Sequence, residues 1–134
     1  MGRPHFLEPL LKGPYTDAYA VVVERLGTPI ATTVEGAFDS ATRNRGLLGR
    51  SIMPEGLAMI IAPSNAIHTW FMRFPIDIVF ARRDGRVVKI RQHVKPWRIA
   101  VSWRAFAAIE LAAGTADRHK LIPGDRLTIV SASH

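Results

Sequence analysis

The sequence predicts a mainly β fold, a single-domain antiparallel β-sandwich or open barrel with one or two short helices. Short runs of β-branched and aromatic residues alternate with turns rich in glycine and proline, which is typical of sandwiches and barrels. The chain has 134 residues, 48% of them hydrophobic, so one domain with one sizeable core is expected. Residues 1–18 hold several prolines and glycines and no periodicity, so we expect a poorly packed amino-terminal arm followed by a β-rich domain over 19–134.

The elements of that domain follow from local patterns. Gly27 and Pro29 end the first strand, and the turn at Pro54 and Gly56 precedes a wholly apolar run that is typical of a buried strand. Asp39 or Ser40 can cap a short helix. The predicted helices lie near 39–48 and 114–120, and the predicted strands span 20–25, 30–38, 57–61, 66–72, 76–81, 86–94, 107–111 and 126–130.

The hairpin around Asp84-Gly85 allows two registers. A two-residue loop would place Arg83 directly opposite Arg86, and like charges in opposition are unfavourable. A three-residue loop with Gly85 at positive φ avoids this. It places Ile78 opposite Ile90 and pairs Asp77 with Arg91. We therefore expect the three-residue loop and an ion pair between Asp77 and Arg91.

The segment from His68 to Asp77 is the strongest candidate for a functional site. It inserts ionisable and aromatic side chains into an apolar run that Pro75 interrupts, and buried polar groups are costly unless they are paired or used. Glu110 is a second carboxylate in an apolar strand, so we expect an arginine partner for it. The predicted binding residues are His68, Trp70, Met72, Arg73, Asp77, Arg91, Trp97 and Glu110.

The residue inventory offers little catalytic chemistry. The chain has no cysteine, no serine lies in a G-x-S-x-G elbow, and the five histidines are scattered without metal-ligand spacing. We therefore assign no catalytic residue, metal ligand or cofactor. The leading hypothesis is a non-catalytic module that binds a small molecule or a protein. The enzymatic alternative is a hydrolase or lyase that uses His68 and Asp77 as an acid–base pair.

The formal net charge of +7 raises a third hypothesis, that of polyanion binding. Four basic side chains at every second position would line one strand face: Lys89, Arg91, His93 and Lys95. Solvation of such a face is the default, so nucleic acid is the less favoured partner. No apolar run is long enough to span a membrane, and the first residues lack the hydrophobic stretch of a secretion signal. The chain is therefore expected to be cytoplasmic as written, or extracytoplasmic if a leader was removed.

Six motifs in order resemble a known family. They are Arg45-Gly46-Leu47-Leu48-Gly49-Arg50, His68 through Asp77, Asp84 through Val88, Pro96-Trp97-Arg98, Glu110 through Ala116, and Gly124-Asp125-Arg126-Leu127. Over residues 30–131 the chain is similar to the bacterial and archaeal family called domain of unknown function 192, in a subgroup with the H-T-x-F-M-R-F-P-I-D form. The resemblance implies a β-dominated fold. It implies no reaction, because the family has no established activity.

Overall fold

The computed structural model describes residues 4–12, 19–38 and 50–131, and strands dominate these residues. The mainly β class and the short helices that the sequence predicts are therefore confirmed. The elements in chain order are α1 (Glu8–Lys12), β1 (Tyr19–Val23), β2 (Thr28–Ala31), β3 (Thr33–Ala37), β4 (Leu57–Ile61), β5 (Ala66–His68), β6 (Ile76–Ala81), β7 (Val87–Val94), β8 (Ile99–Val101), β9 (Ala107–Ala112), α3 (Thr115–Arg118) and β10 (Leu127–Ser131).

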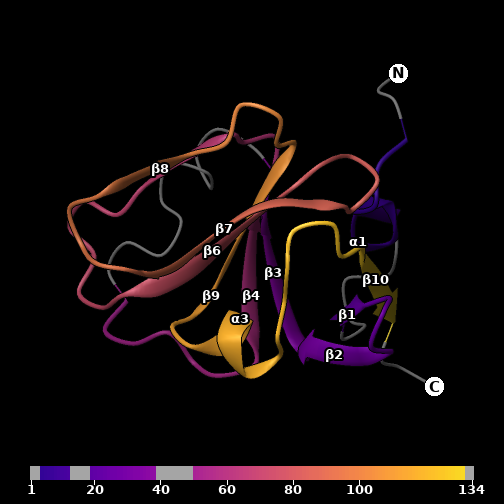
Figure 1. Cartoon of the computed structure of the whole chain (residues 1–134), viewed down its shortest axis with the longest axis horizontal. Coiled ribbons are helices and arrows are strands. Elements are labelled where there is room, and N and C mark those ends of the chain that lie inside the picture. Colours follow the sequence, from indigo (N-terminus) through magenta and orange to yellow (C-terminus); the bar gives the residue numbers. More distant parts are fainter. Residues whose placement is uncertain (1–3, 13–18, 39–49, 132–134) are drawn as a thin grey trace.

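The strands form three sheets. The central sheet has the order β3-β4-β9-β6-β7, a three-stranded sheet has the order β10-β1-β2, and β5 pairs with β8 as a two-stranded ribbon. Figure 1 shows β8 on one side of the central strands and β1, β2 and β10 on the other. The strand pairs are antiparallel, as predicted, except that β3 and β4 run parallel, so the central sheet is mixed.

The central sheet is buried on both faces, which explains why β4, β6 and β9 are almost uninterrupted apolar runs. One face packs against the three-stranded sheet in a first core cluster that includes Val21, Ile60 and Ile109. The other face packs beneath the β5–β8 ribbon in a second cluster that includes Ile78 and Ile67. The ribbon is thus the outer layer over the second cluster.

Most predicted elements are present, with informative differences. The predicted strands at 57–61 and 76–81 match β4 and β6, and α3 lies in the predicted helix at 114–120. The single strand expected over 30–38 is two strands in different sheets. It is broken at Thr32, whose N–H donates to the Gly56 carbonyl at 2.9 Å. The run 66–72 is a strand only to His68, and β8 was not predicted. The helix expected at 39–48 lies outside the described residues.

The amino-terminal residues pack more tightly than expected. Leu7 is fully buried in the first core cluster, and Phe6 and Leu10 pack against that cluster. The Phe6 N–H also donates to the Arg83 carbonyl at 2.7 Å. The expectation of a poorly packed arm is therefore wrong for this part of the chain, because its apolar side chains find the edge of the core. The division into an arm over 1–18 and a domain over 19–134 stays a prediction.

The β6–β7 hairpin confirms the predicted turn but not the predicted register. Gly85 has a φ of 86°, and the Arg82 N–H donates to the Arg86 carbonyl at 2.9 Å, which closes a three-residue loop. A bulge at Val88 then shifts the pairing, so that Ile78 lies opposite Arg91 and not Ile90. Val88, the bulged residue, is partly buried and packs against the second core cluster.

Candidate functional site

Thr69 forms hydrogen bonds that connect the segment after β5 to the segment before β8. Its backbone N–H donates to the Arg98 carbonyl at 2.8 Å, and its carbonyl accepts from the Trp97 N–H at 3.0 Å. Its hydroxyl accepts from the Arg98 N–H at 2.9 Å and donates to the Lys95 carbonyl at 2.7 Å. The Thr69 side chain is fully buried. Residues 69–72 and 95–98 are therefore held by one threonine, which the sequence analysis missed because threonine is common in strands.

The clamp by Thr69 presents two aromatic residues in an unusual backbone conformation. Phe71 and Trp97 have φ values of 65° and 66°, a left-handed region that bulky residues rarely adopt. Their rings meet edge to face with centroids 4.7 Å apart. Yet Phe71 is 67% exposed and Trp97 is 56% exposed. The fold thus holds two strained aromatic residues outward, a combination found at functional sites.

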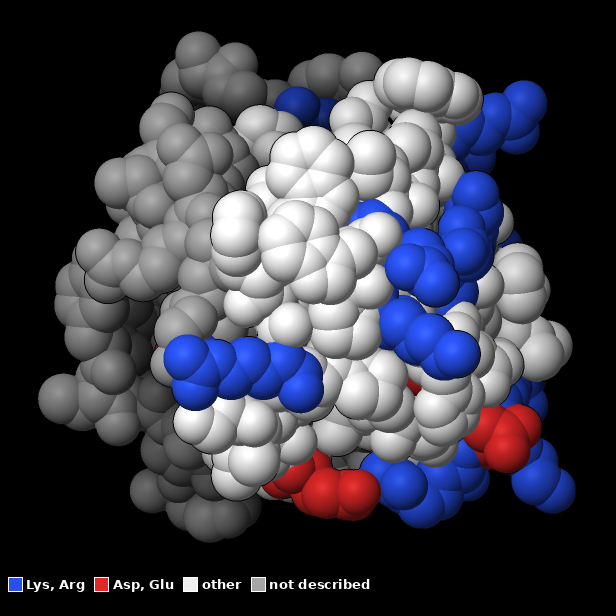
Figure 2. Space-filling model, turned by 90° about the vertical axis from the view of Figure 1, so that its left-hand side faces the viewer, with Lys and Arg blue, Asp and Glu red and all other residues white. Residues whose placement is uncertain are grey.

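Neighbouring side chains extend this exposed apolar patch. The rings of His68 and Trp70 lie 5.0 Å apart, and His68 pairs across the ribbon with Ile99, which is also exposed. Figure 2 views this end of the molecule and shows a protruding group of uncharged atoms with lysine and arginine side chains along one flank. We call the patch the aromatic surface, and it consists of His68, Trp70, Phe71, Trp97 and Ile99.

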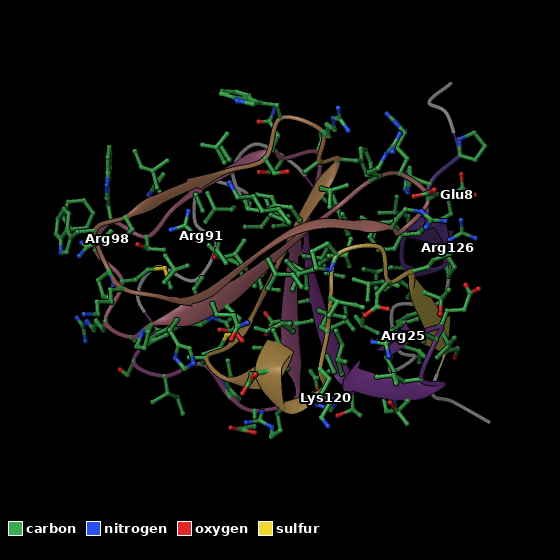
Figure 3. All side chains as sticks on the ribbon, viewed as in Figure 1. Glu8, Arg25, Arg91, Arg98, Lys120 and Arg126 are labelled. Carbon is green, nitrogen blue, oxygen red and sulfur yellow. The ribbon has the colours of Figure 1, made fainter. Side chains whose placement is uncertain are left out.

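Two other predicted binding residues lie close to this segment but differ in exposure. Arg73 is exposed and has no hydrogen bond or ion pair with described residues. Met72 is buried in the second core cluster, where it supports the segment from beneath. Arg98, which was not predicted, lies at the same end of the molecule as Arg91, as Figure 3 shows. Its guanidinium donates to the Pro96 carbonyl at 3.3 Å.

Asp77 has a structural role that differs from the predicted one. Its carboxylate is fully buried and accepts three backbone hydrogen bonds, from His93 at 2.9 Å, Gly114 at 3.1 Å and Ala116 at 2.9 Å. The expected pair with Arg91 is wrong. Ile78 is the residue opposite Arg91, and successive side chains of a strand point to opposite faces. Asp77 thus joins the end of β7 to the start of α3.

The same finding removes the predicted acid–base pair. His68 lies on the exposed ribbon, and its aromatic neighbour is Trp70. The Asp77 carboxylate is occupied by backbone N–H groups inside the fold, and no hydrogen bond or ion pair joins it to His68. A general base needs its orienting partner within hydrogen-bond reach. The structure therefore does not assemble the arrangement that the enzymatic alternative requires.

Glu110 lies in a row of directly opposed residues across all five strands of the central sheet. In order, the row reads Glu35, Met59, Glu110, Ile78 and Arg91. Opposed residues point to the same face of a sheet, so both carboxylates lie on the face that carries the second core cluster. An acidic pair and one arginine thus share a face that is otherwise apolar.

Burial without an ion pair changes the titration of Glu110. The side chain is 2% exposed, and its Oε1 has no hydrogen-bond partner among the described residues. Desolvation raises the pKa of Glu110 to about 8, and the charge of Arg50 opposes this rise. Arg50 forms its own hydrogen bonds with Glu35 at 2.7 and 3.2 Å. Among the described residues no arginine therefore pairs directly with Glu110, and its raised pKa favours the neutral form at pH 7.

The basic strip predicted along β7 is interrupted. Lys89 is half-buried, and its Nζ donates to the Val101 carbonyl at 2.7 Å, so it ties β7 to β8. His93 has a φ of 51°, and the pairing of β6 with β7 shifts again nearby. Lys95 lies beyond the end of the strand. The four residues therefore do not form the continuous anion track that strict alternation predicts.

Comparison with known proteins establishes the family. A family model for domain of unknown function 192, described as an uncharacterised ACR, matches residues 21–129. The chain belongs to this family. Two of the family-like motifs, His68 to Asp77 and Pro96 to Arg98, contain residues of the aromatic surface, and the motif from Glu110 to Ala116 donates hydrogen bonds to Asp77. The glycine motif that ends at Arg50 lies largely outside the described residues.

Two solved structures have the same fold as this member of domain of unknown function 192. One is a protein of unknown function from Novosphingobium aromaticivorans, with 24% identity, coverage of 82% of each chain and a TM-score of 0.70. The other, from Sinorhizobium meliloti, is provisionally described as a transcription regulator. It has 26% identity and a TM-score of 0.72 and covers 90% of this chain and 98% of its own. The comparison with curated proteins finds no match.

Two features are absent from the part of this family member that the structure describes. Residues 4–12, 19–38 and 50–131 contain no group of three histidine, aspartate or glutamate side chains placed to hold a metal ion. None of the described helices is long and apolar enough to cross a bilayer.

Proposed function

We propose that this protein is a non-catalytic binding module that holds a small molecule or a segment of a partner protein on the aromatic surface. The observation that carries the proposal is the pair Phe71 and Trp97, which are exposed although each has a strained, left-handed backbone. Strain of this kind costs about 1–3 kcal/mol per residue. Large rings that are exposed to water add nothing to the stability of the fold. Exposed apolar patches mark binding sites, so we assign a binding role to these two residues.

The chemistry of the aromatic surface defines what it can bind. Trp97 and Phe71 meet edge to face, which leaves open ring faces for stacking. Arg73 and Arg98 add exposed positive charge at its margin. Groups with a flat apolar face suit such a surface, including aromatic rings, sugar rings and proline-containing peptides. Ligands of this type that also carry negative charge are favoured over cationic ones.

A thermal-shift screen against metabolites, sugars and proline-containing peptides tests the proposal, since a ligand that binds the folded state raises Tm. We expect Trp97→Ala to abolish the shift caused by any ligand that the screen finds. Trp103→Ala is the matched control. Trp103 is 81% exposed, but it lies beyond the other end of β8 and outside the aromatic surface. A ligand that stabilises the Trp97→Ala variant as much as the unmodified protein would show that the aromatic surface is not its site.

A further inference from the structure

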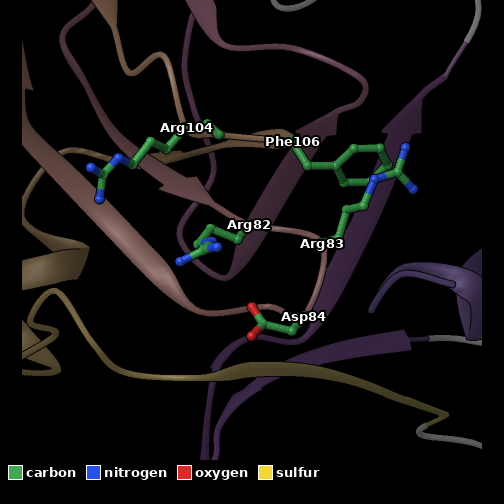
Figure 4. A pocket seen from close by; sticks show the side chains of 6 residues that line it. Arg82, Arg83, Asp84, Arg104 and Phe106 are labelled. Carbon is green, nitrogen blue, oxygen red and sulfur yellow. The ribbon is translucent and has the colours of Figure 1, made fainter. Parts of the chain in front are cut away.

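A cavity lies between two segments that are distant in the sequence. It has a volume of about 390 Å³ and is lined by the β6–β7 turn and by the end of the β8–β9 connection. Figure 4 shows it from close by. The side chains around it come from six residues: Arg82, Arg83, Asp84, Arg104, Ala105 and Phe106. None of them belongs to the aromatic surface.

Backbone hydrogen bonds hold the two walls of this cavity in place. The Phe106 N–H donates to the Ala81 carbonyl at 2.8 Å, which links the β8–β9 connection to the end of β6. The Gly85 N–H closes the hairpin turn on the Arg82 carbonyl at 2.9 Å. Both walls are thus parts of the central sheet or direct extensions of it. A site supported in this way needs little ordering when a ligand enters.

The charges around the cavity are unbalanced. The side chains of Arg82 and Arg104 are exposed, and neither guanidinium group forms a hydrogen bond or ion pair with the described residues. In Figure 4 their guanidinium groups extend toward the same side of the cavity, while Arg83 turns toward Phe106. The Arg83 guanidinium lies 4.4 Å from the centre of the Phe106 ring, a cation–π contact that fixes it there.

The single carboxylate of the cavity does not neutralise these arginines. Asp84 accepts a hydrogen bond from the Arg86 N–H at 3.0 Å and lies 3.7 Å from the Arg126 guanidinium. The Arg86 amide and the surrounding arginines hold the pKa of Asp84 below its usual value, so the group is ionised at neutral pH. The guanidinium groups of Arg82 and Arg104 thus face the cavity, and its one carboxylate already has other partners. An entering anion would relieve the repulsion between the arginines.

We infer that this cavity binds a small molecule that carries a phosphate group, with Arg82 and Arg104 as the two arms that contact the phosphate. The planar guanidinium matches the geometry of phosphate oxygens and forms paired, charge-assisted hydrogen bonds with them. The cavity volume is in the range of small-molecule sites. A concave site on one side of a hairpin turn favours a small anion over an extended nucleic-acid strand, which needs a continuous basic groove.

Isothermal titration calorimetry of the full chain at low salt, with pyrophosphate and inorganic phosphate as probes, tests this inference. We expect pyrophosphate to bind more tightly than phosphate, because it can contact both arginines. The Arg82→Gln, Arg104→Gln double variant loses the charged donors and should bind pyrophosphate at least about tenfold more weakly. Arg118→Gln changes an exposed arginine of α3 that belongs to neither proposed site, and this matched control should bind as the unmodified protein does.

Two further measurements distinguish binding in this cavity from binding elsewhere on the protein. A random single-stranded oligonucleotide tests nucleic acid, and the Trp97→Ala variant tests whether the aromatic surface takes part. Pyrophosphate affinity should be unchanged in Trp97→Ala, even if that variant loses every ligand of the aromatic surface. The inference is overturned if pyrophosphate gives no binding heat, if the double variant binds it as well as the unmodified protein, or if only the oligonucleotide binds.

Discussion

The hydroxyl of Thr69 accepts a hydrogen bond from the Arg98 backbone N–H at 2.9 Å, between residues that are 29 positions apart. This contact joins the segment that follows β5 to the segment that precedes β8. Every residue of the aromatic surface lies within a few positions of it. One buried threonine therefore connects the stability of the fold with the geometry of the candidate site.

Replacement of Thr69 by valine should destabilise the protein and loosen the aromatic surface. Valine keeps the shape of the side chain but leaves the Arg98 N–H and the Lys95 carbonyl without their partner. A buried polar group that loses its hydrogen bond costs about 1–3 kcal/mol. Urea unfolding measures the loss. Thr128→Val is the control, because the Thr128 hydroxyl has no hydrogen bond with described residues. Equal stability of the two variants would contradict a stabilising role for the hydrogen bonds of the Thr69 hydroxyl.

Stability should fall as the pH rises from about 4.5 to about 8, because of Glu110. Burial raises its pKa to about 8 in the folded protein from the usual value of 4.5. Between these values the folded state keeps a proton that the unfolded state has lost, so each unit of pH increase lowers the free energy of unfolding. The total effect is on the order of a few kcal/mol. Below pH 4.5 both states are protonated, and the contribution is fully present.

The variant Glu110→Gln isolates this effect, since glutamine cannot lose a proton. Urea unfolding of the variant across the same pH range should show a much smaller slope than that of the unmodified protein. Glu24→Gln changes an exposed carboxylate and should keep the original slope. A Glu110→Gln variant with an unaltered slope would mean that another group carries the pH dependence.

Replacement of Asp77 by asparagine should release the start of α3. The carboxylate accepts from Gly114 and Ala116 through one oxygen and from His93 through the other. Asparagine has only one acceptor oxygen, and its NH₂ group would face a backbone donor. We expect a loss of about 2 kcal/mol or more and faster hydrogen exchange of the Ala116 amide. Asp117→Asn, in the exposed part of the same helix, should change neither quantity.

Two glycines with positive φ should respond differently to alanine. At Gly27 a β-carbon would meet no atom within 4 Å, so Gly27→Ala carries only the conformational penalty of about 1–2 kcal/mol. At Gly85 the β-carbon would collide with the Leu127 carbonyl oxygen. This oxygen belongs to the backbone of β10, so moving it would disturb that strand. Gly85→Ala should therefore cost at least about twice as much. Chemical denaturation of both variants makes the comparison, and similar losses would refute the close approach.

Local patterns predicted much of the fold. The runs at 57–61 and 76–81 are strands with the predicted bounds, because continuous apolar residues between turn signals have few alternatives in a small β domain. The positive φ of Gly85 was predictable because the turn chemistry of Asp-Gly is local. Strand β8 was missed because three residues, one of them an exposed isoleucine, carry too little periodicity.

The candidate site was predictable only as a region. The segment around His68 to Asp77 and the position of Trp97 were identified from their unusual composition. The roles within that region were not. Asp77 was expected to meet Arg91, but a one-residue bulge at Val88 places Ile78 there. A register shift of one residue reverses the face of every later side chain, and no local signal reports it.

The β-rich class, the turn at Gly85 and the absence of cysteine chemistry were predictable because they depend on residue identity and on neighbours a few positions away. The hydrogen bonding of the two buried carboxylates was not predictable, because it depends on which distant segments pack against each strand. Asp77 and Glu110 both lie in apolar strands. Asp77 meets three backbone N–H groups brought from two distant segments, whereas Glu110 meets the apolar face beneath the ribbon. Their difference depends on long-range packing, which sets the solvation and the partners of each group.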